Sequence, residues 1–322
     1  MPAALAFEGP AADEPIRSFE EEVRWGLSQG VKRLSPKHLY DEAGSALFDR
    51  ICSLDEYYLT RTELQIMREH GAEMAGAIGP EAQVIELGAG SVVKIRLLLE
   101  QLDRPAAFAP VDISGEHLEA AASELSTDYP HIPIVPVVAD FTRQFRIPAP
   151  ARIPARRVVY FPGSTIGNFE TEDAKALMRA VAAMLDPGDG LLIGVDLVKP
   201  EPVLQAAYDD REGTTAAFIT NVLARLNREL DGDFELASFD YLAEWQVEPS
   251  RMAMFLVSNR DQMVRVAGQR YGFRAGERLL VEYSHKYTLE RFAAFAEDTG
   301  FRVDRVWTDP KRHFSVQMLT VR

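Results

Sequence analysis

Two acidic residues and a glycine-rich turn occur along the chain in an order typical of nucleoside-binding sites. The segment "ELGAGS" places Gly88 and Gly90 between an apolar run and an amphipathic helix. Asp112 ends the next apolar run, 22 residues after Gly90, and an acid at this distance commonly binds the hydroxyl pair of a ribose. Asp140 and Phe141 end the third apolar run, where they would offer an adenine ring an acceptor and an apolar wall.

The residues of this turn narrow the choice of ligand. The turn lacks the lysine–serine pair of a phosphate-binding Walker loop and the third glycine of a dinucleotide fingerprint. An ordinary tight turn would explain the two glycines by themselves, but acids at two successive strand ends weigh against that alternative. The pattern therefore favours S-adenosylmethionine over a dinucleotide.

The segment "VEYSHKY" is a second candidate for chemistry. In a strand, Glu282 and Ser284 project to the same face, because side chains alternate with a period of two. An acid beside a hydroxyl suits an imidazole, which offers one N–H donor and either an acceptor or a second N–H. The exposed face of an edge strand is the commoner explanation of such a pair by itself. His285 lies on the opposite face and is interpreted as structural.

Metal and covalent chemistry find no support in the sequence. The remaining histidines are scattered, without an HExxH motif or clustered carboxylates, so we expect no metal site. The chain also has no G-x-S-x-G elbow and no Cys–His signature of a covalent nucleophile.

The candidate residues at strand ends require strands that run side by side. Apolar runs alternate with amphipathic helices through the middle of the chain, which predicts a parallel sheet covered by helices on both faces. A helix over 288–300 and two strands joined by a "PKR" turn complete a pattern that resembles the class I, Rossmann-like methyltransferase fold of α/β proteins. The five predicted strands cover residues 83–87, 106–114, 132–141, 157–165 and 190–198.

Two further segments interrupt or precede this pattern. The sequence therefore predicts two domains, each built from separated pieces of the chain. The predicted methyltransferase core comprises residues 61–196 plus 287–322, and the predicted discontinuous substrate-binding domain comprises residues 1–60 plus 197–286.

The composition indicates which cellular compartment and which kinds of partner to expect. The 322 residues are 47% hydrophobic and carry a net charge of −14, which argues against nucleic acid or an anionic membrane as partner. The lone Cys52 cannot form an internal disulfide, which fits a reducing compartment. With no secretory signal and no apolar run of ~18 residues, we expect a cytoplasmic, monomeric protein whose partner is a small molecule.

Four longer segments resemble one family closely. These segments, and their order along the chain, are similar to those of the histidine Nα-methyltransferases of ergothioneine biosynthesis. The resemblance covers nearly the whole chain from about residue 20, and it implies transfer of three methyl groups from S-adenosylmethionine to the α-amine of histidine, giving hercynine. These segments are "SPKHLYDEAGSALFDRICSLDEYYLTRTE" (35–63), "IELGAGSVVKIRLLL" (85–99), "YFPGSTIGNF" (160–169) and "DPKRHFSVQM" (309–318).

The resemblance also implies a role for individual residues. Asn168 and Tyr208 are similar to the pair that grips the substrate carboxylate, and Glu282 and Ser284 become the imidazole contacts. Tyr40 and Asn168 are expected to orient the amine. The cofactor contacts implied are Tyr40, Gly88, Lys94, Asp112, Asp140 and Phe141; the further substrate contacts are Tyr57 and Met254, with Tyr58 and Met252 as neighbours that match almost equally well.

Three alternatives stay open at this level. A sister enzyme forming the betaine of tyrosine or another amino acid would share the fold and differ around Glu282. A methyltransferase for another small molecule would keep the cofactor residues and lose the carboxylate grip. A non-catalytic protein that binds S-adenosylmethionine as a regulator is the third.

Overall fold

The chain divides into two compact units, each built from separated segments. The computed structural model describes residues 5–7, 18–90, 92–143 and 145–322. The first unit contains Thr62–Leu197 and Tyr287–Arg322, together with the strand β1 (Leu5–Phe7). The second contains Val198–Lys286 and residues 18–61.

The first unit is organised around a mostly parallel sheet. Within the described residues this sheet has seven strands, in the order β13-β14-β7-β6-β2-β3-β4. All neighbours from β7 to β4 are parallel, whereas β14 is antiparallel to both β7 and β13. A parallel sheet closed by a reversed terminal hairpin confirms the expected class I methyltransferase fold. The strands are β2 (Ala82–Leu87), β3 (Ala107–Asp112), β4 (Val137–Val138), β6 (Arg156–Phe161), β7 (Gly190–Asp196), β13 (Phe301–Thr308) and β14 (Phe314–Val321).

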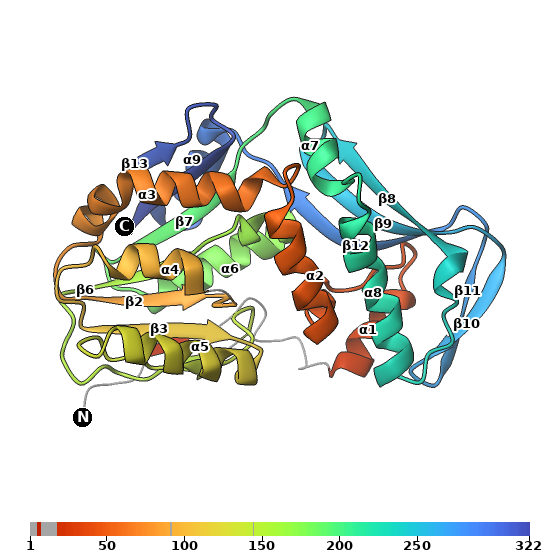
Figure 1. Cartoon of the computed structure of the whole chain (residues 1–322), viewed down its shortest axis with the longest axis horizontal. Coiled ribbons are helices and arrows are strands. Elements are labelled where there is room, and N and C mark those ends of the chain that lie inside the picture. The colour runs from red at the N-terminus through yellow and green to blue at the C-terminus, as the bar shows by residue number, and fades with distance from the viewer. Residues whose placement is uncertain (1–4, 8–17, 91, 144) are drawn as a thin grey trace. The chain divides into compact units, whose positions relative to one another are not determined.

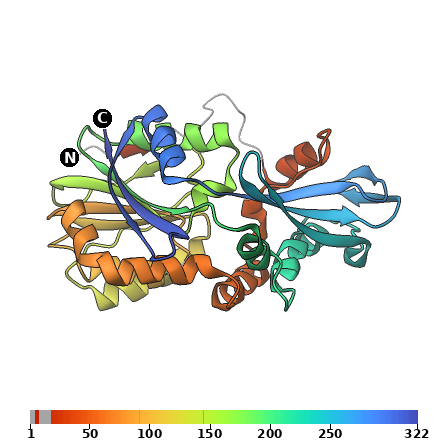
Figure 2. The same cartoon turned by 90° about the horizontal axis from the view of Figure 1, so that it is seen from above.

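Helices cover both faces of this sheet, as Figure 2 shows. The apolar side chains of α6 (Thr171–Met184) and α9 (Leu289–Asp298) join those of the strands in one large core cluster. On the other face lie α3 (Tyr58–Ile78), α4 (Val92–Leu99) and α5 (Gly115–Asp128). The Tyr160 hydroxyl of β6 donates to Met67 Sδ of α3 at 3.3 Å. Helices on both faces explain why β2 and β7 are buried at every position.

The third predicted strand is much shorter than its apolar run. Residues 132–141 were expected to form one strand, but β4 contains only Val137 and Val138, at the edge of the sheet. Pro133 and Pro136 have no N–H to donate to a ladder, which confines such a segment to edge positions. A short bridge between Ile134 and Phe108 is all that continues the pairing upstream.

The N-terminal segment differs from its predicted assignment. The sequence analysis assigned all of residues 1–60 to the inserted domain. Strand β1 instead pairs antiparallel with β5 (Phe145–Ile147), a strand of the first unit. A three-residue strand has too little apolar pattern to reveal its partner in the sequence.

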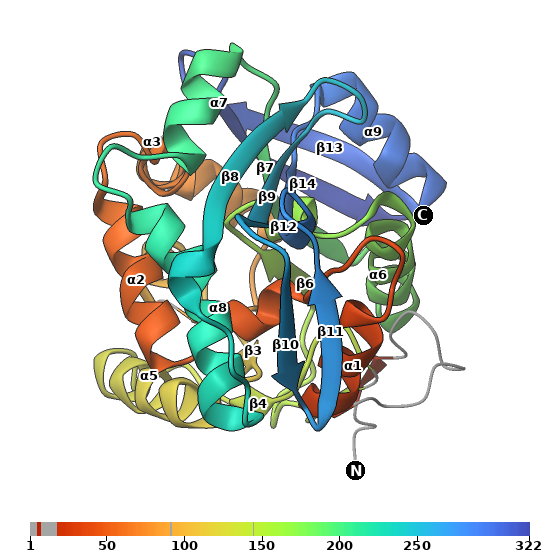
Figure 3. The ribbon, with the colours of Figure 1, turned by 90° about the vertical axis from the view of Figure 1, so that its right-hand side faces the viewer.

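The second unit combines an antiparallel sheet with helices (Figures 1 and 3). The strands β8 (Phe239–Gln246), β9 (Arg251–Ser258) and β12 (Arg278–His285) pair in the order β12-β9-β8. The hairpin of β10 (Gln262–Val266) and β11 (Gln269–Phe273) is a separate small sheet. The helices are α1 (Phe19–Leu27), α2 (Glu42–Ser53), α7 (Glu201–Tyr208) and α8 (Thr214–Glu229), with 3-10 turns at Pro36–Leu39 and Leu236–Ser238.

Helix α8 shows why this unit holds together. Its buried residues Phe218, Val222 and Leu226 recur every four positions and therefore lie on one face of the helix. That face packs against α2 and the sheet strands β8 and β9. The Asp210 carboxylate accepts hydrogen bonds from the first N–H groups of α8, those of Thr214 at 2.9 Å and Thr215 at 2.7 Å.

Candidate functional site

The glycine turn lies at the carboxyl end of β2 and requires glycine at its first position. Gly88 has φ +78°, a left-handed conformation that other residues adopt only with strain. The N–H groups of Gly88 and Ala89 both donate to the Val111 carbonyl, at 2.9 and 3.1 Å. A Cβ at Gly88 would lie 3.6 Å from the Phe141 ring. The turn, the end of β3 and Phe141 therefore form one cradle.

Asp112 occupies the end of β3 beside this cradle. Its Oδ1 accepts a hydrogen bond from the Ser114 N–H at 2.8 Å. Burial raises the pKa of the Asp112 carboxyl, and backbone N–H groups partly oppose that rise. A half-buried carboxylate at a strand end is suited to accept hydrogen bonds from a ligand hydroxyl pair.

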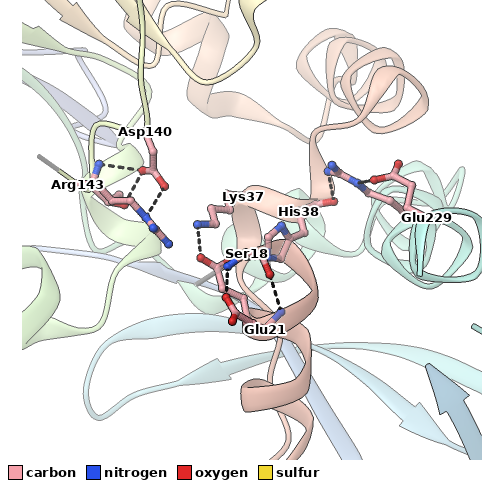
Figure 4. Close-up of polar contacts among 10 residues, drawn as sticks. Ser18, Glu21, Lys37, His38, Asp140, Arg143 and Glu229 are labelled. Atoms are coloured by element: carbon pink, nitrogen blue, oxygen red, sulfur yellow. Dashed lines mark hydrogen bonds and ion pairs between the residues drawn. The ribbon is translucent and has the colours of Figure 1, made fainter. Parts of the chain in front are cut away.

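Asp140 and Phe141 lie in a turn after β4, where the Asp140 carboxylate is held locally (Figure 4). Its Oδ1 accepts from the Thr142 N–H at 3.0 Å and the Thr142 hydroxyl at 2.5 Å. Its Oδ2 lies 3.4 Å from Arg143 Nε. The Phe141 ring meets Phe161 edge-on at 5.6 Å and partly joins the core. Asp140 is thus fixed in direction, and Phe141 presents an apolar ring next to Gly88.

Lys94 is paired with a carboxylate that the sequence analysis did not single out. Its Nζ lies 2.5 Å from Glu63 Oε2, and the Glu63 side chain is almost fully buried. Glu63 also accepts from the Gly163 N–H, at 3.0 Å to each oxygen. Glu63 and Gly163 come from segments 100 residues apart, so only the folded chain reveals the group.

Glu86 is a second buried acid beneath the turn. It belongs to β2, and burial raises its pKa well above the usual value, while Lys94 opposes the rise. Glu63 and Asp112 add to the rise by charge repulsion. The raised pKa favours the protonated form of Glu86. An acid inside the apolar run "VIEL" was the available signal for this residue.

Asn168 ends the 3-10 turn Thr165–Asn168 that follows β6. The turn begins at Ser164, which has a left-handed φ of 59°, and Ser164 Oγ accepts from the Asp196 N–H of β7 at 2.9 Å. Two neighbouring parallel strands thus fix the turn, and Asn168 is half-buried in the first unit.

The other substrate candidates lie in the second unit. Tyr208, the last residue of α7, and Ser284 of β12 are both buried, and their hydroxyl oxygens lie 2.7 Å apart. Lys286 Nζ donates to the Tyr208 hydroxyl at 2.7 Å and to Ser284 Oγ at 2.6 Å. The structure therefore brings Tyr208 and Ser284 together and adds Lys286, which the sequence analysis missed although it continues the period-two pattern of Glu282 and Ser284.

Glu282 lies on the same face of β12 as Ser284. Its register partner on β9 is Met254, whereas Ser284 is opposite Met252. Residues opposite one another in an antiparallel pair share a face, so both methionines line this face and Met254 is the neighbour of Glu282. Burial raises the Glu282 pKa to about 8, and the charge of Lys286 opposes the rise.

The two adjacent tyrosines have different surroundings. The Tyr57 ring meets the Tyr208 ring edge-on at 6.2 Å. Burial raises the Tyr57 pKa well above 10, and Tyr208 and Glu282 contribute to that rise by their charges. Tyr58 instead accepts a hydrogen bond from Lys199 Nζ at 2.6 Å. Tyr57, not Tyr58, therefore shares the surroundings of Tyr208 and Glu282.

Tyr40 belongs to the second unit, unlike the other candidate cofactor residues. Its ring is 39% exposed and lies 5.5 Å from both Phe48 and Phe218 in edge-on contacts. This aromatic group holds the ring in place, and Tyr40 stays partly exposed to solvent.

The described part of the chain contains neither a cluster of metal-ligating side chains nor a membrane-spanning helix. No group of three or more His, Cys, Asp or Glu side chains there could hold a metal ion. None of the helices there is long and apolar enough to cross a membrane.

The fold is that of a class I methyltransferase. Comparison with known proteins gives the family. A model of the family "Histidine-specific methyltransferase, SAM-dependent" matches residues 19–321, and the chain therefore belongs to this family.

Individual relatives agree with this assignment. The chain is 40% identical to the histidine N-alpha-methyltransferase of Mycolicibacterium smegmatis, over 96% of each protein. It is 37% identical to the histidine N-alpha-methyltransferase of Mycobacterium tuberculosis, over 94% of each protein. It is 33% identical to the ergothioneine biosynthesis protein 1 of Neurospora crassa, over 87% of this chain and 32% of that protein.

Proposed function

We propose that the protein transfers three methyl groups from S-adenosylmethionine to the α-amine of L-histidine. The product is hercynine, and the reaction is the first step of ergothioneine biosynthesis. The observation that carries this proposal is the buried polar group of the second unit, in which Tyr208 and Ser284 are hydrogen-bonded beside Glu282. A binding site with several buried polar groups suits a polar amino-acid side chain better than an apolar one.

The first unit is proposed to be the methyltransferase core, in which the cradle at Gly88 holds the methyl donor. Asp112 would accept hydrogen bonds from the ribose hydroxyls, and Asp140 and Phe141 would contact the adenine. Lys94 would meet the methionyl carboxylate, with Glu63 fixing the ammonium in place. Tyr40 completes the proposed set. Support comes from the glycine at φ +78° and the position of Asp112 at the end of β3.

The second unit is proposed to be the substrate-binding domain. Glu282 and Ser284 would hydrogen-bond the imidazole, while Tyr57 and Met254 would contact its edges. Tyr208 would bind the substrate carboxylate, a role that the family resemblance also gives to Asn168. The separate surroundings of Tyr57 and Tyr58, and the register of Met254 with Glu282, support these choices.

The proposed chemistry depends on alignment. S-adenosylmethionine supplies a methyl group that its sulfonium already activates. Orienting residues can lower such a barrier by ~7–11 kcal/mol, and Tyr40 and Asn168 are proposed to orient the amine directly or through water. The amine must be neutral, although free α-amines have pKa values of about 7.7–8.0. Desolvation beside a cation lowers that pKa, so no dedicated base is assigned.

The alternative of a betaine-forming enzyme for tyrosine is not favoured by the histidine-specific relatives. It would share the fold but would not need an acid at Glu282. Wild-type protein, S-adenosylmethionine and equal concentrations of histidine, tyrosine, phenylalanine and tryptophan form the test, read by mass-spectrometric counting of added methyl groups. We expect trimethylated histidine, and preferential trimethylation of tyrosine would refute the proposal.

Calorimetry separates catalysis from regulation. An enzyme should bind histidine and dimethylhistidine in the presence of S-adenosylhomocysteine, whereas a regulator that only senses S-adenosylmethionine should bind neither. We further propose that the protein acts as a monomer in the cytoplasm, which the lone Cys52 supports.

A further inference from the structure

Lys286 is the last residue of the second unit and directly follows β12. Its side chain is only 1% exposed, although burial of an ammonium costs several kcal/mol unless it is compensated. Its backbone is fixed on both sides, because its N–H donates to the Ser250 carbonyl at 2.8 Å and its carbonyl accepts from Ser250 Oγ at 3.1 Å. The ammonium therefore has a well-defined position.

The contacts of Lys286 constrain the direction of two hydroxyl groups. An ammonium can only donate, so Tyr208 Oη and Ser284 Oγ both act as acceptors toward it. The two hydroxyls are also hydrogen-bonded to each other, which uses one of their two hydrogens. Neither hydroxyl hydrogen can point at Lys286. The lysine thus fixes the positions of both hydroxyl oxygens and turns their hydrogens away from itself.

The charge of Lys286 also affects the ionisation of Glu282. Glu282 projects from the same strand face, and the charge of Lys286 opposes the rise in its pKa. Tyr57 before α3 and Tyr241 of β8 both interact electrostatically with Glu282, and Tyr208, Asp209 and Asp210 also act on Tyr241. The pKa values of Tyr57 and Tyr241 are raised well above 10, so these two phenols are neutral at pH 7. Lys286 is a cation that favours ionised Glu282.

We propose that Lys286 is a positioning residue that links recognition of the two ends of the substrate. It holds the Tyr208 hydroxyl that is proposed to bind the substrate carboxylate, and through Ser284 and Glu282 it sets the polarity offered to the imidazole. This inference rests on the proposed function, because it assigns the carboxylate and the imidazole to those residues.

The chain offers a matched control in a second buried lysine. Lys199, only 7% exposed, donates to the Tyr58 hydroxyl at 2.6 Å and lies 4.3 Å from the centre of its ring. Lys286 makes the same kind of contact to Tyr208, at 2.7 Å and 4.6 Å. Both pairs lie in the second unit, but no substrate contact is assigned to Tyr58. Replacing either lysine removes one ammonium–phenol contact of similar geometry.

The experiment compares wild type with Lys286→Met, Lys286→Gln and Lys199→Met in the full chain. Steady-state methylation of histidine and of histamine, which lacks the carboxylate, gives KM and kcat, and calorimetry gives histidine affinity between pH 6 and 9. Affinity for S-adenosylhomocysteine checks folding. Methionine removes both the charge and the donors, whereas glutamine keeps two N–H donors and removes only the charge.

We expect Lys286→Met to raise the KM for histidine about tenfold or more, with a smaller change in kcat. Its preference for histidine over histamine should fall. Lys286→Gln should recover part of the KM, yet both variants should move the pH midpoint of histidine affinity upward, because Glu282 loses its cation. Lys199→Met should keep the wild-type KM and midpoint.

Several results would overturn the role of Lys286. One is that Lys286→Met keeps the wild-type KM for histidine and the wild-type pH midpoint of histidine affinity. If that variant does not fold, the same result in Lys286→Gln would overturn the role. Another is an equal loss in Lys199→Met, which would show that any buried lysine of this unit supports the fold alone. If wild type itself adds no methyl group to histidine, the proposed function fails first and the positioning role fails with it.

Discussion

Replacing Glu282 with glutamine should stabilise the fold at alkaline pH while it impairs histidine recognition. The folded-state pKa of Glu282 is raised from 4.5 to about 8 by burial. Between these two values the unfolded chain has released the proton and the folded chain has kept it. Stability from this group is therefore complete below pH 4.5 and is lost as the pH rises through 8.

The size of the effect follows from the shift. At ~1.4 kcal/mol per pKa unit, the loss between pH 4.5 and 8 amounts to about 5 kcal/mol. This is an upper limit, because the Glu282 side chain keeps some exposure to solvent. Glutamine has a similar shape and does not titrate, so Glu282→Gln removes this dependence. The same substitution removes the ionised acceptor for the imidazole, which should lower kcat/KM for histidine roughly 10- to 150-fold at pH 8.5.

Urea unfolding at pH 5.5, 6.5, 7.5 and 8.5 measures how the stability of each variant depends on pH. The difference in unfolding free energy between Glu282→Gln and wild type should increase with pH and level off above 8. Glu290→Gln, at an exposed position at the start of α9, is the control and should show no such gain. A pH-independent difference for Glu282→Gln would refute the raised pKa, and an unchanged kcat/KM for histidine would remove Glu282 from the substrate site.

The remaining predictions concern the cofactor cradle and the carboxylate contacts. Asp112→Ala should weaken S-adenosylmethionine binding at least tenfold with the fold intact, since it removes an acceptor for two hydroxyls; calorimetry showing unchanged affinity in a folded variant would exclude Asp112 from the site. Gly88→Ala should cost ~1–2 kcal/mol of stability, because φ +78° strains any residue with a Cβ, and thermal unfolding with no loss of Tm would contradict this. Asn168→Ala and Tyr208→Phe should each raise the KM for histidine while leaving histamine comparatively unaffected; wild type that binds histamine as tightly as histidine would disprove the carboxylate grip.

The sequence by itself determined the layered α/β core. Apolar runs of five or more residues separated by amphipathic helices leave few arrangements other than a parallel sheet covered on both faces. The same runs located the carboxyl ends of the strands, and therefore Gly88, Asp112 and Asp140. The prediction was wrong in extent at β4, where two prolines interrupt the ladder, because an apolar pattern reports burial and not backbone N–H donors.

The polar contacts were decided only by the tertiary structure. Lys94 meets Glu63, and Tyr208 meets Ser284 from 76 residues away, and no local pattern specifies such distant partners. The adjacent Tyr57 and Tyr58 were indistinguishable in the sequence, yet one faces Tyr208 and the other accepts from Lys199. In the sequence, Lys286 cannot be distinguished from an ordinary charged residue after a strand, and only the structure shows that it is buried. The direction of a hydrogen bond and the pKa of a buried acid depend on which groups the rest of the chain places within a few ångströms, and that information exists only in three dimensions.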